Sequence, residues 1–171
     1  MSAGQSGARL QLDWRCAHFD TLTPAELYAI TRARISVFIV EQTCPYQDAD
    51  GADPACHHLW TLAGGRDIAA YLRIVPPGVK CAEPSLGRIL TTAVGRGQGL
   101  GRALVHEGIR RVESMYGVQP IRIGAQRYLL AFYESFGFVR TGYDYDEDDI
   151  PHSEMLRPAR RTVTGGGASL L

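Results

Sequence analysis

The run Arg96-Gly97-Gln98-Gly99-Leu100-Gly101 has residue types and a spacing that suit the binding of a phosphate group. Its three glycines carry no side chains, so the backbone can come close to a ligand. Apolar residues at helical spacing follow over 100–116, and the first turn of a helix has unpaired N–H groups. Those donors and the positive end of the helix dipole favour an anion such as pyrophosphate. Arg96 adds a positive charge with several hydrogen-bond donors.

The same residues also suit a glycine-rich turn between a strand and a helix that binds no ligand. The glycines do not follow G-x-G-x-x-G, and no Gly-Lys-Ser or Gly-Lys-Thr comes after them. These two absences exclude the dinucleotide fingerprint and the ATP P-loop. The run alone therefore leaves a phosphate-binding loop and an empty turn as alternatives.

The chain of 171 residues has the composition of an ordinary globular protein, 45% hydrophobic and 21% charged, with a formal net charge of zero. This length predicts one domain with a sizeable core. The zero net charge gives no reason to expect nucleic acid or an anionic membrane as a partner. No apolar run approaches the roughly 20 residues of a membrane span, and residues 1–9 lack a signal-peptide core, so we expect a cytoplasmic protein.

The four cysteines are Cys16, Cys44, Cys56 and Cys81, and no two of them form a C-x-x-C pair. A zinc site made of Cys44 and residues 56–58 is disfavoured, because adjacent residues of a strand point to opposite faces of the sheet. We therefore expect reduced thiols and no metal.

Hydrophobic spacing predicts an order of strands and helices along the chain. Strands are expected at 8–16, 57–63, 68–75, 86–92, 118–124, 138–145 and 150–156, and helices from Thr23, over 37–40, over 100–116 and over 128–135. This order predicts an α/β fold with helices packed on a mixed, mostly antiparallel sheet. We expect one domain over 9–157, with disordered segments at 1–8 and 158–171.

Two motifs in this order resemble those of the GNAT (GCN5-related) N-acetyltransferases. Arg96, Gly99 and Gly101 fill the defining places of the Arg/Gln-x-x-Gly-x-Gly/Ala signature of that family. The run Tyr133-Glu134-Ser135-Phe136-Gly137-Phe138 is similar to the Tyr-Glu-Lys-Leu-Gly-Phe run that ends the GNAT core. It follows the loop after one strand and one helix, as in the family. The resemblance implies a twisted sheet with a splayed strand pair, flanked by helices.

Further runs resemble the ElaA-like branch of GNAT proteins, over residues 10 to 157 as a whole. They are 34–42, 44–48, Asp50-Gly51, Gly124-Ala125-Gln126 and 149–152, where the branch usually has glycine at the place of Asp149. The substrates of that branch are largely uncharacterised, so the resemblance implies the donor better than the acceptor.

The resemblance implies acetyl-CoA as the co-substrate. The strand edge at 89–91 would bind the pantetheine arm, the loop at 96–102 would bind the pyrophosphate, and the amide of Gln126 would contact the arm. The donor-binding residues expected in this way are Ile89, Leu90, Thr91, Arg96, Gly97, Gln98, Gly99, Leu100, Gly101, Arg102 and Gln126.

Tyr133 is the expected general acid, because in many GNAT proteins this hydroxyl protonates the departing thiolate. The alternative is a core tyrosine that packs like its neighbours Phe132 and Phe136. Glu41 is the candidate base that takes the proton from the amine, and the alternative is a surface carboxylate at a helix end. His152 and then His58 are weaker candidates, since a lone histidine is more often structural. The backbone N–H near Leu90 would stabilise the developing oxyanion.

Two acidic segments remain open to more than one interpretation. The loop at 41–55 can be a substrate loop with carboxylates, or a solvated loop whose aspartates cap turns. The run 144–149 can attract a cationic amine, or it can be a solvated turn between the last two strands.

The expected function is transfer of an acetyl group to a primary amine of a small-molecule or protein acceptor. One alternative is a module that binds acyl-CoA without turnover. Another is an acyltransferase similar to acyl-homoserine-lactone synthases, which resemble the chain at Arg34, Val37, Phe38 and Glu41. The oligomeric state is open, with a homodimer as one option.

Overall fold

A seven-stranded sheet forms the centre of the computed structural model, which describes residues 12–159. The strand order is β1-β2-β3-β4-β5-β7-β6. The strands are β1 (Arg15–His18), β2 (His57–Ala63), β3 (Asp67–Val75), β4 (Ser85–Thr91), β5 (Ile121–Gln126), β6 (Val139–Glu147) and β7 (Ile150–Arg157). All neighbouring pairs are antiparallel except β4 and β5, which are parallel. The predicted mixed, mostly antiparallel sheet is therefore confirmed.

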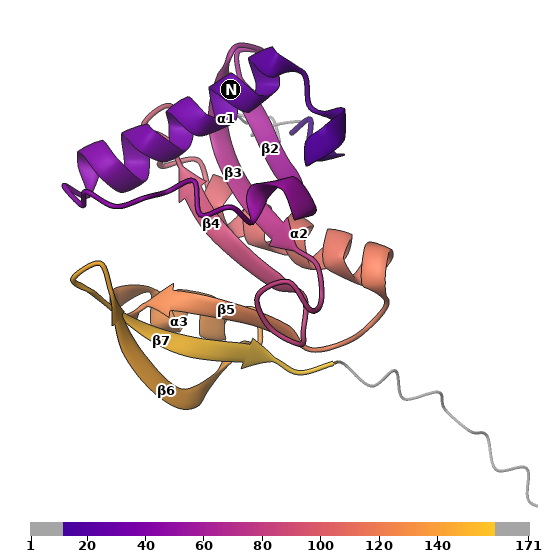
Figure 1. Cartoon of the computed structure of the whole chain (residues 1–171), viewed down its shortest axis with the longest axis vertical. Coiled ribbons are helices and arrows are strands. Elements are labelled where there is room, and N and C mark those ends of the chain that lie inside the picture. The colour runs from indigo at the N-terminus through magenta and orange to yellow at the C-terminus, as the bar shows by residue number, and fades with distance from the viewer. Residues whose placement is uncertain (1–11, 160–171) are drawn as a thin grey trace, which may run out of the picture.

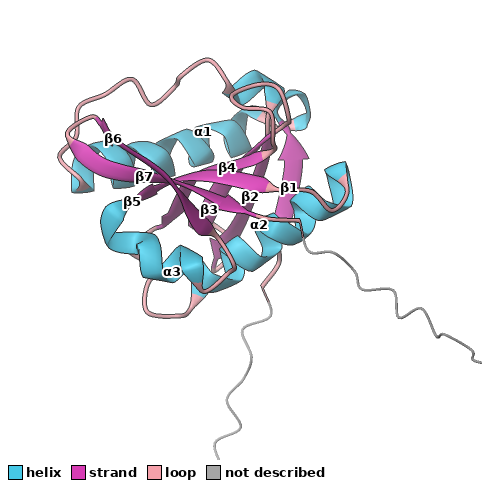
Figure 2. Ribbon diagram, turned by 90° about the horizontal axis from the view of Figure 1, so that it is seen from below, coloured by secondary structure: helices cyan, strands magenta, loops and turns pink. Residues whose placement is uncertain are grey.

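Helices cover both faces of this sheet (Figure 2). The helical segments are α1 (Pro24–Arg34), η2 (Ile35–Glu41), α2 (Leu100–Tyr116), α3 (Leu130–Glu134) and the short 3₁₀ turns η1 (Phe19–Thr21), η3 (Asp53–Ala55) and η4 (Arg127–Leu129). Residues of β3 alternate between the two layers, as strand geometry requires. Leu72 and Ile74 pack in the core with α2, whereas Tyr71 packs in a second core with α1.

The helix that starts at Thr23 begins as its sequence predicts. The Thr23 hydroxyl accepts a hydrogen bond from the backbone N–H of Glu26, and the Glu26 carboxylate accepts one from the N–H of Thr23. The predicted short helix over 37–40 is not separate, because η2 continues directly from α1 as a π-helix. Such wider turns are rare and are frequent at functional sites.

Strands β4 and β5 diverge along the chain (Figure 1). Only Ser85 and Arg122 are paired between them, so the rest of the β4 edge that faces β5 lacks a strand partner. This is the splayed pair that the GNAT resemblance implies. Strand β4 also carries a bulge between Gly87 and Leu90, where Arg88 has a φ of 53°. A bulge bends its strand and is common beside active sites.

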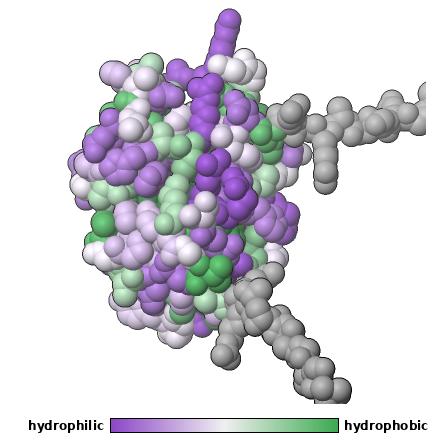
Figure 3. All heavy atoms as spheres, turned by 90° about the vertical axis from the view of Figure 1, so that its right-hand side faces the viewer, coloured by the Kyte–Doolittle hydropathy of each residue, from purple (hydrophilic) through white to green (hydrophobic). Residues whose placement is uncertain are grey.

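The first strand begins at Arg15. The predicted disordered segments, 1–8 and 158–171, lie outside the described residues except for 158 and 159. Within residues 12–159, no helix is long and apolar enough to span a membrane. On the face seen in Figure 3, hydrophobic residues are scattered among hydrophilic ones, as is usual for the surface of a globular domain.

Candidate active site

A cavity of about 720 Å³ lies between the diverging strands β4 and β5. This volume is in the range of small-molecule and cofactor sites. The predicted site residues that line it are Glu41, Ile89, Leu90, Thr91, Arg96, Gln126 and Tyr133. They come from η2, β4, the loop before α2, the end of β5 and α3. Residues far apart in the sequence, such as Glu41 and Tyr133, therefore share one cavity.

The loop before α2 has the geometry of an anion-binding turn. Gly97 and Gly99 have φ values of 75° and 72°, in the left-handed region that favours glycine. Gly99 is the residue before α2, and it gives the helix no side-chain cap. Its carbonyl accepts a hydrogen bond from the N–H of Ala103 at 3.2 Å. The N–H groups of the first turn are therefore available to a phosphate.

Gln98 and Arg102 in this loop have partners of their own. Gln98 donates to the Val94 carbonyl at 3.0 Å, which closes the turn. Arg102 donates to the Ser135 hydroxyl at 3.1 Å and stacks over Phe136 of the motif that ends the core. The side chains of these two residues therefore hold the loop, while its backbone offers the free donors.

Gly95 was missed by the sequence reasoning. A Cβ atom at this position would lie 2.2 Å from the backbone oxygen of Ala69 on β3. Glycine is therefore needed for the loop to cross β3 closely. Its position next to Arg96, in the same glycine-rich stretch, was the available signal.

Arg96 and Glu41 form an ion pair at one part of the cavity. Arg96 Nη2 lies 2.5 Å from Glu41 Oε2 and donates to the Thr91 carbonyl at 3.1 Å. Both side chains remain partly exposed to solvent. The pair joins the end of η2, the end of β4 and the loop before α2. The candidate base Glu41 therefore lies beside Arg96, the cation that is predicted to bind the pyrophosphate.

Tyr133 combines a buried ring with a hydroxyl at the cavity. The ring packs edge-on against Phe132 and Phe138, and the residue is 6% exposed. Burial raises the pKa of the Tyr133 hydroxyl above its usual value, and nearby Tyr128 raises it further. Among residues 12–159 the hydroxyl has no hydrogen-bond partner. The hydroxyl is thus protonated and free to donate, in a residue that both lines the cavity and belongs to the aromatic core.

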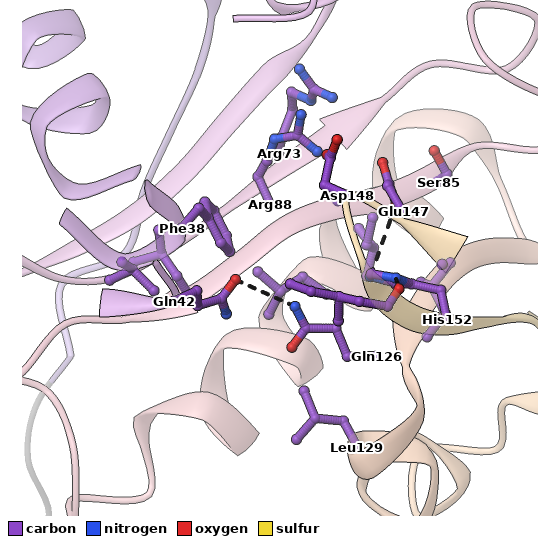
Figure 4. Close-up of a pocket in the computed structure, with 18 of the residues that line it drawn as sticks. Phe38, Gln42, Arg73, Ser85, Arg88, Gln126, Leu129, Glu147, Asp148 and His152 are labelled. Atoms are coloured by element: carbon purple, nitrogen blue, oxygen red, sulfur yellow. Dashed lines mark hydrogen bonds and ion pairs between the residues drawn. The ribbon is translucent and has the colours of Figure 1, made fainter. Parts of the chain in front are cut away.

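Gln126 lies at the end of β5, where it faces η2 across the cavity (Figure 4). Its amide nitrogen is 3.5 Å from the side-chain oxygen of Gln42. This long contact leaves the amide free to exchange Gln42 for a ligand.

His152 on β7 also lines the cavity, and the sequence ranked it below Glu41. It is 8% exposed, its Nδ1 lies 2.7 Å from the Ile150 carbonyl, and its ring stacks on Tyr145. The hydroxyl of Tyr145 would lie 2.1 Å from a Cβ atom at position 124, so the Tyr145 ring lies directly over Gly124.

The aspartates of the loop at 41–55 form ion pairs that the sequence did not predict. Asp48, Asp50 and Asp53 are paired with Arg34, Arg73, Arg88 and Lys80. Asp50 also caps a turn, as in one of the two interpretations of this loop, because its carboxylate accepts a hydrogen bond from the N–H of Ala52 at 3.1 Å. Asp48, Asp50 and Asp53 do not line the cavity, whereas Glu41 at the start of the loop does. The ion pairs join residues distant in sequence, which local turn patterns do not report.

His58 and the cysteines have structural partners. His58 is fully buried, and its Nδ1 lies 2.8 Å from the Tyr71 hydroxyl. The thiols of Cys44 and Cys56 donate to the carbonyls of Asp148 and Ala52. Within the described part of the chain, no group of three or more His, Cys, Asp or Glu residues is placed to hold a metal ion.

Comparison with known proteins agrees with this geometry. Residues 33–157 match the family model described as an acetyltransferase (GNAT) domain. Protein ElaA of Escherichia coli (strain K12) is 35% identical over 147 residues, which are 85% of this chain and 96% of ElaA. Its crystal structure superposes with a TM-score of 0.79 at 33% identity and covers 85% of this chain and 99% of that one.

Two other solved structures are informative. An acyl-CoA N-acyltransferase from Pseudomonas aeruginosa has a TM-score of 0.80 at 40% identity, covering 85% of this chain and 99% of that one. A CoA-dependent acyl-homoserine lactone synthase, BjaI, has a TM-score of 0.72 at 16% identity, covering 88% of this chain and 84% of that one, which shows a shared fold alone. The motifs, the splayed sheet and these relatives agree, and the chain belongs to the GNAT acetyltransferase family, in its ElaA-like branch.

Proposed function

We propose that this protein transfers the acetyl group of acetyl-CoA to a primary amine, carried by a small molecule or a protein. One observation supports this most strongly: a single cavity contains the open edge of β4, the loop cation Arg96 and the free hydroxyl of Tyr133. A pantetheine arm can add to a strand edge through backbone hydrogen bonds, as an extended peptide does. The similarity to an acyl-CoA N-acyltransferase from Pseudomonas aeruginosa supports an acyl-CoA donor.

The donor would extend along β4 into the loop before α2. The edge at Ile89, Leu90 and Thr91 would bond the pantetheine arm, and Gln126 would contact it from β5. The pyrophosphate would lie on the backbone of 97–102, with Arg96 beside it. The bulge at Arg88 lies beside this edge, which lines the cavity, and the N–H of Leu90 would stabilise charge on the thioester oxygen.

In the proposed reaction, a neutral amine attacks the thioester carbonyl carbon directly. The new C–N bond forms, the C–S bond breaks, and Tyr133 gives its proton to the departing thiolate. A base at the cavity accepts the proton of the attacking nitrogen, and Glu41 is the base that the sequence suggests. Holding donor and amine together would supply most of the acceleration, and proton transfer the rest.

The test is an acceptor screen that follows release of the CoA thiol and identifies products by mass. Release of CoA together with an acetylated amine supports the proposal. Binding of acetyl-CoA without an acetylated product from any amine would instead indicate a binding module. A lactone formed from S-adenosylmethionine and an acyl donor would indicate an acyl-homoserine lactone synthase.

A further inference from the structure

Strands β5, β6 and β7 form one wall of the cavity, and His152 lies on this wall. Ser153 and Met155 of β7 are fully buried, so His152 and Glu154, which alternate with them along the strand, face the cavity. His152 is paired with Gln126 on β5 and with Tyr145 on β6. It therefore lies on the same face as the residue that is expected to contact the donor (Figure 4).

The hydrogen bond of His152 determines which nitrogen can accept a proton. Nδ1 lies 2.7 Å from the Ile150 carbonyl, and a carbonyl oxygen only accepts, so Nδ1 carries the proton. In the neutral ring Nε2 then has a free lone pair. Within residues 12–159 no group donates a hydrogen bond to Nε2, although the residue is more than nine-tenths buried. The ring is thus oriented as a base would be, and stacking on Tyr145 holds its plane.

Glu147 faces the same nitrogen across a short gap. Its Oε2 lies 3.9 Å from His152 Nε2. This separation is too long for a hydrogen bond, but it allows one nitrogen, to the side of the line that joins the two atoms, to lie about 2.9 Å from both. An amine placed there can donate to both the histidine and the carboxylate.

The charges around the cavity favour a cation as its occupant. Its cations are all paired with carboxylates: Arg73, Lys80, Arg88, Arg96 and Arg122. Among the described residues, the carboxylate of Glu147 has no ion-pair partner other than His152, and that of Asp148 has none. The uncompensated charge of the wall is therefore negative.

Asp148 is fixed in position by its backbone. It has a φ of 52°, in the left-handed region that Asp and Asn tolerate. Its carbonyl accepts a hydrogen bond from the Cys44 thiol at 3.3 Å, which ties the β6–β7 turn to the loop after η2. The turn between β6 and β7 is therefore held against the loop after η2, and Asp148 lines the cavity from this turn.

We propose that His152, Glu147 and Asp148 form the acceptor site, and that it takes an amine with a second positive charge, such as an aliphatic diamine. His152 Nε2 accepts the proton of the attacking nitrogen as the C–N bond forms, and Tyr133 protonates the thiolate as the C–S bond breaks. Glu147 accepts a hydrogen bond from the attacking nitrogen, which is neutral, and Asp148 binds the positive charge of the second nitrogen. This inference rests on the proposed acetyl transfer, and it assigns the base to β7 instead of Glu41.

The first test compares His152→Gln with His106→Gln, using acetyl-CoA and 1,3-diaminopropane. His106 is exposed on α2 and does not line the cavity. The His152 variant should lose about 100-fold or more in kcat, with a small change in KM, because a general base is removed. Added imidazole should restore part of the rate of His152→Ala and leave the rate of His106→Ala unchanged. An unchanged kcat in His152→Gln, or a comparable loss in Glu41→Gln without any in His152→Gln, would overturn the assignment.

The second test compares two adjacent aspartates of one turn. Asp148→Asn and Asp149→Asn each remove one charge, and both positions have a left-handed φ that Asn accepts. Only Asp148 lines the cavity. Its variant should raise the KM for 1,3-diaminopropane roughly 3- to 10-fold and leave the KM for propylamine unchanged. Equal effects of the two variants, or equal effects on the two amines, would contradict the acceptor site.

Calorimetry with acetyl-CoA separates this inference from the function on which it rests. The variants of His152, His106, Asp148 and Asp149 should bind acetyl-CoA as the wild type does, which also shows that they are folded. If the wild type turns over neither amine, the proposed transfer to such amines fails. If it acetylates propylamine as well as the diamine and His152→Gln does the same, the transfer stands and the acceptor site is wrong.

Discussion

Glu41 at the end of η2 and Arg96 in the loop before α2 form an ion pair, with 2.5 Å between Oε2 and Nη2. Arg96 is the cation that the sequence motif assigns to the pyrophosphate of the donor, and in this structure Glu41 is its partner. A bound pyrophosphate and Glu41 would therefore compete for Arg96, and donor binding would release the carboxylate.

Replacement of Glu41 by glutamine should strengthen the binding of CoA. Both side chains of the pair are partly exposed, so its contribution is small. We expect a dissociation constant for CoA lower by up to about 5-fold, measured by calorimetry at low salt. Asp13→Asn removes the same charge from an exposed residue outside this cavity and should leave CoA binding unchanged. Weaker binding in Glu41→Gln would mean that the carboxylate helps to hold the donor.

Tyr133→Phe should lower turnover and leave CoA binding intact. The aromatic contacts with Phe132 and Phe138 are kept, and only the free hydroxyl is lost. We expect kcat to fall roughly 100-fold if the hydroxyl protonates the thiolate. Tyr28→Phe, on the exposed surface of α1, is the matched control. Equal turnover of the Tyr133 variant and the wild type, with chemistry rate-limiting, would remove the residue from the mechanism.

Gly95→Ala should destabilise the protein, whereas Gly101→Ala should not. The added Cβ at position 95 would meet the Ala69 oxygen at 2.2 Å, while at position 101 the nearest atom of Thr91 is at 3.8 Å. We expect a loss of about 1–3 kcal/mol in the free energy of unfolding for Gly95→Ala, measured by denaturant titration. A Gly95 variant as stable as the Gly101 variant would show that the loop can move away from β3.

Asp53→Asn should destabilise the fold through the buried ion network. Asp53 accepts hydrogen bonds from Arg34 and Arg73, whose side chains are almost fully buried. The loss of one partner of a buried pair costs about 3 kcal/mol or more. The control is Asp67→Asn, which breaks an exposed pair with Arg32 and should cost less than about 1 kcal/mol. Similar costs for both variants would mean that the network adds no stability.

The same ion pairs should also make the free energy of unfolding depend on pH. Hydrogen bonds from Arg73 hold the pKa of Asp50 well below its usual value. A carboxyl group with a lowered pKa in the folded state stabilises the protein above the unfolded value of about 3.9. That stability is lost as the pH falls below this value towards the folded pKa. Denaturant midpoints should therefore decrease between about pH 5 and about pH 2, and a flat profile over this range would contradict the pairing.

The fold and the glycine-rich turn before α2 were predictable because their signals are local. The glycines at 97–101 and the run 133–138 are contiguous, and helical spacing indicated the bounds of α2. The partners of Asp48, Asp50 and Asp53 were not predictable, because they come from α1, β3 and β4. The state of His152 also depends on the fold, since its bond to the Ile150 carbonyl and its place opposite Gln126 require the strand register.

Calorimetric titration with acetyl-CoA tests the central claim, a donor site at the loop before α2. It should be made on the wild type and on an Arg96→Glu, Gly99→Asp double variant, which places negative charge where the pyrophosphate would bind. We predict saturable binding to the wild type and none to the double variant, with both proteins folded. No binding to the wild type, or equal binding to both, would contradict the donor site.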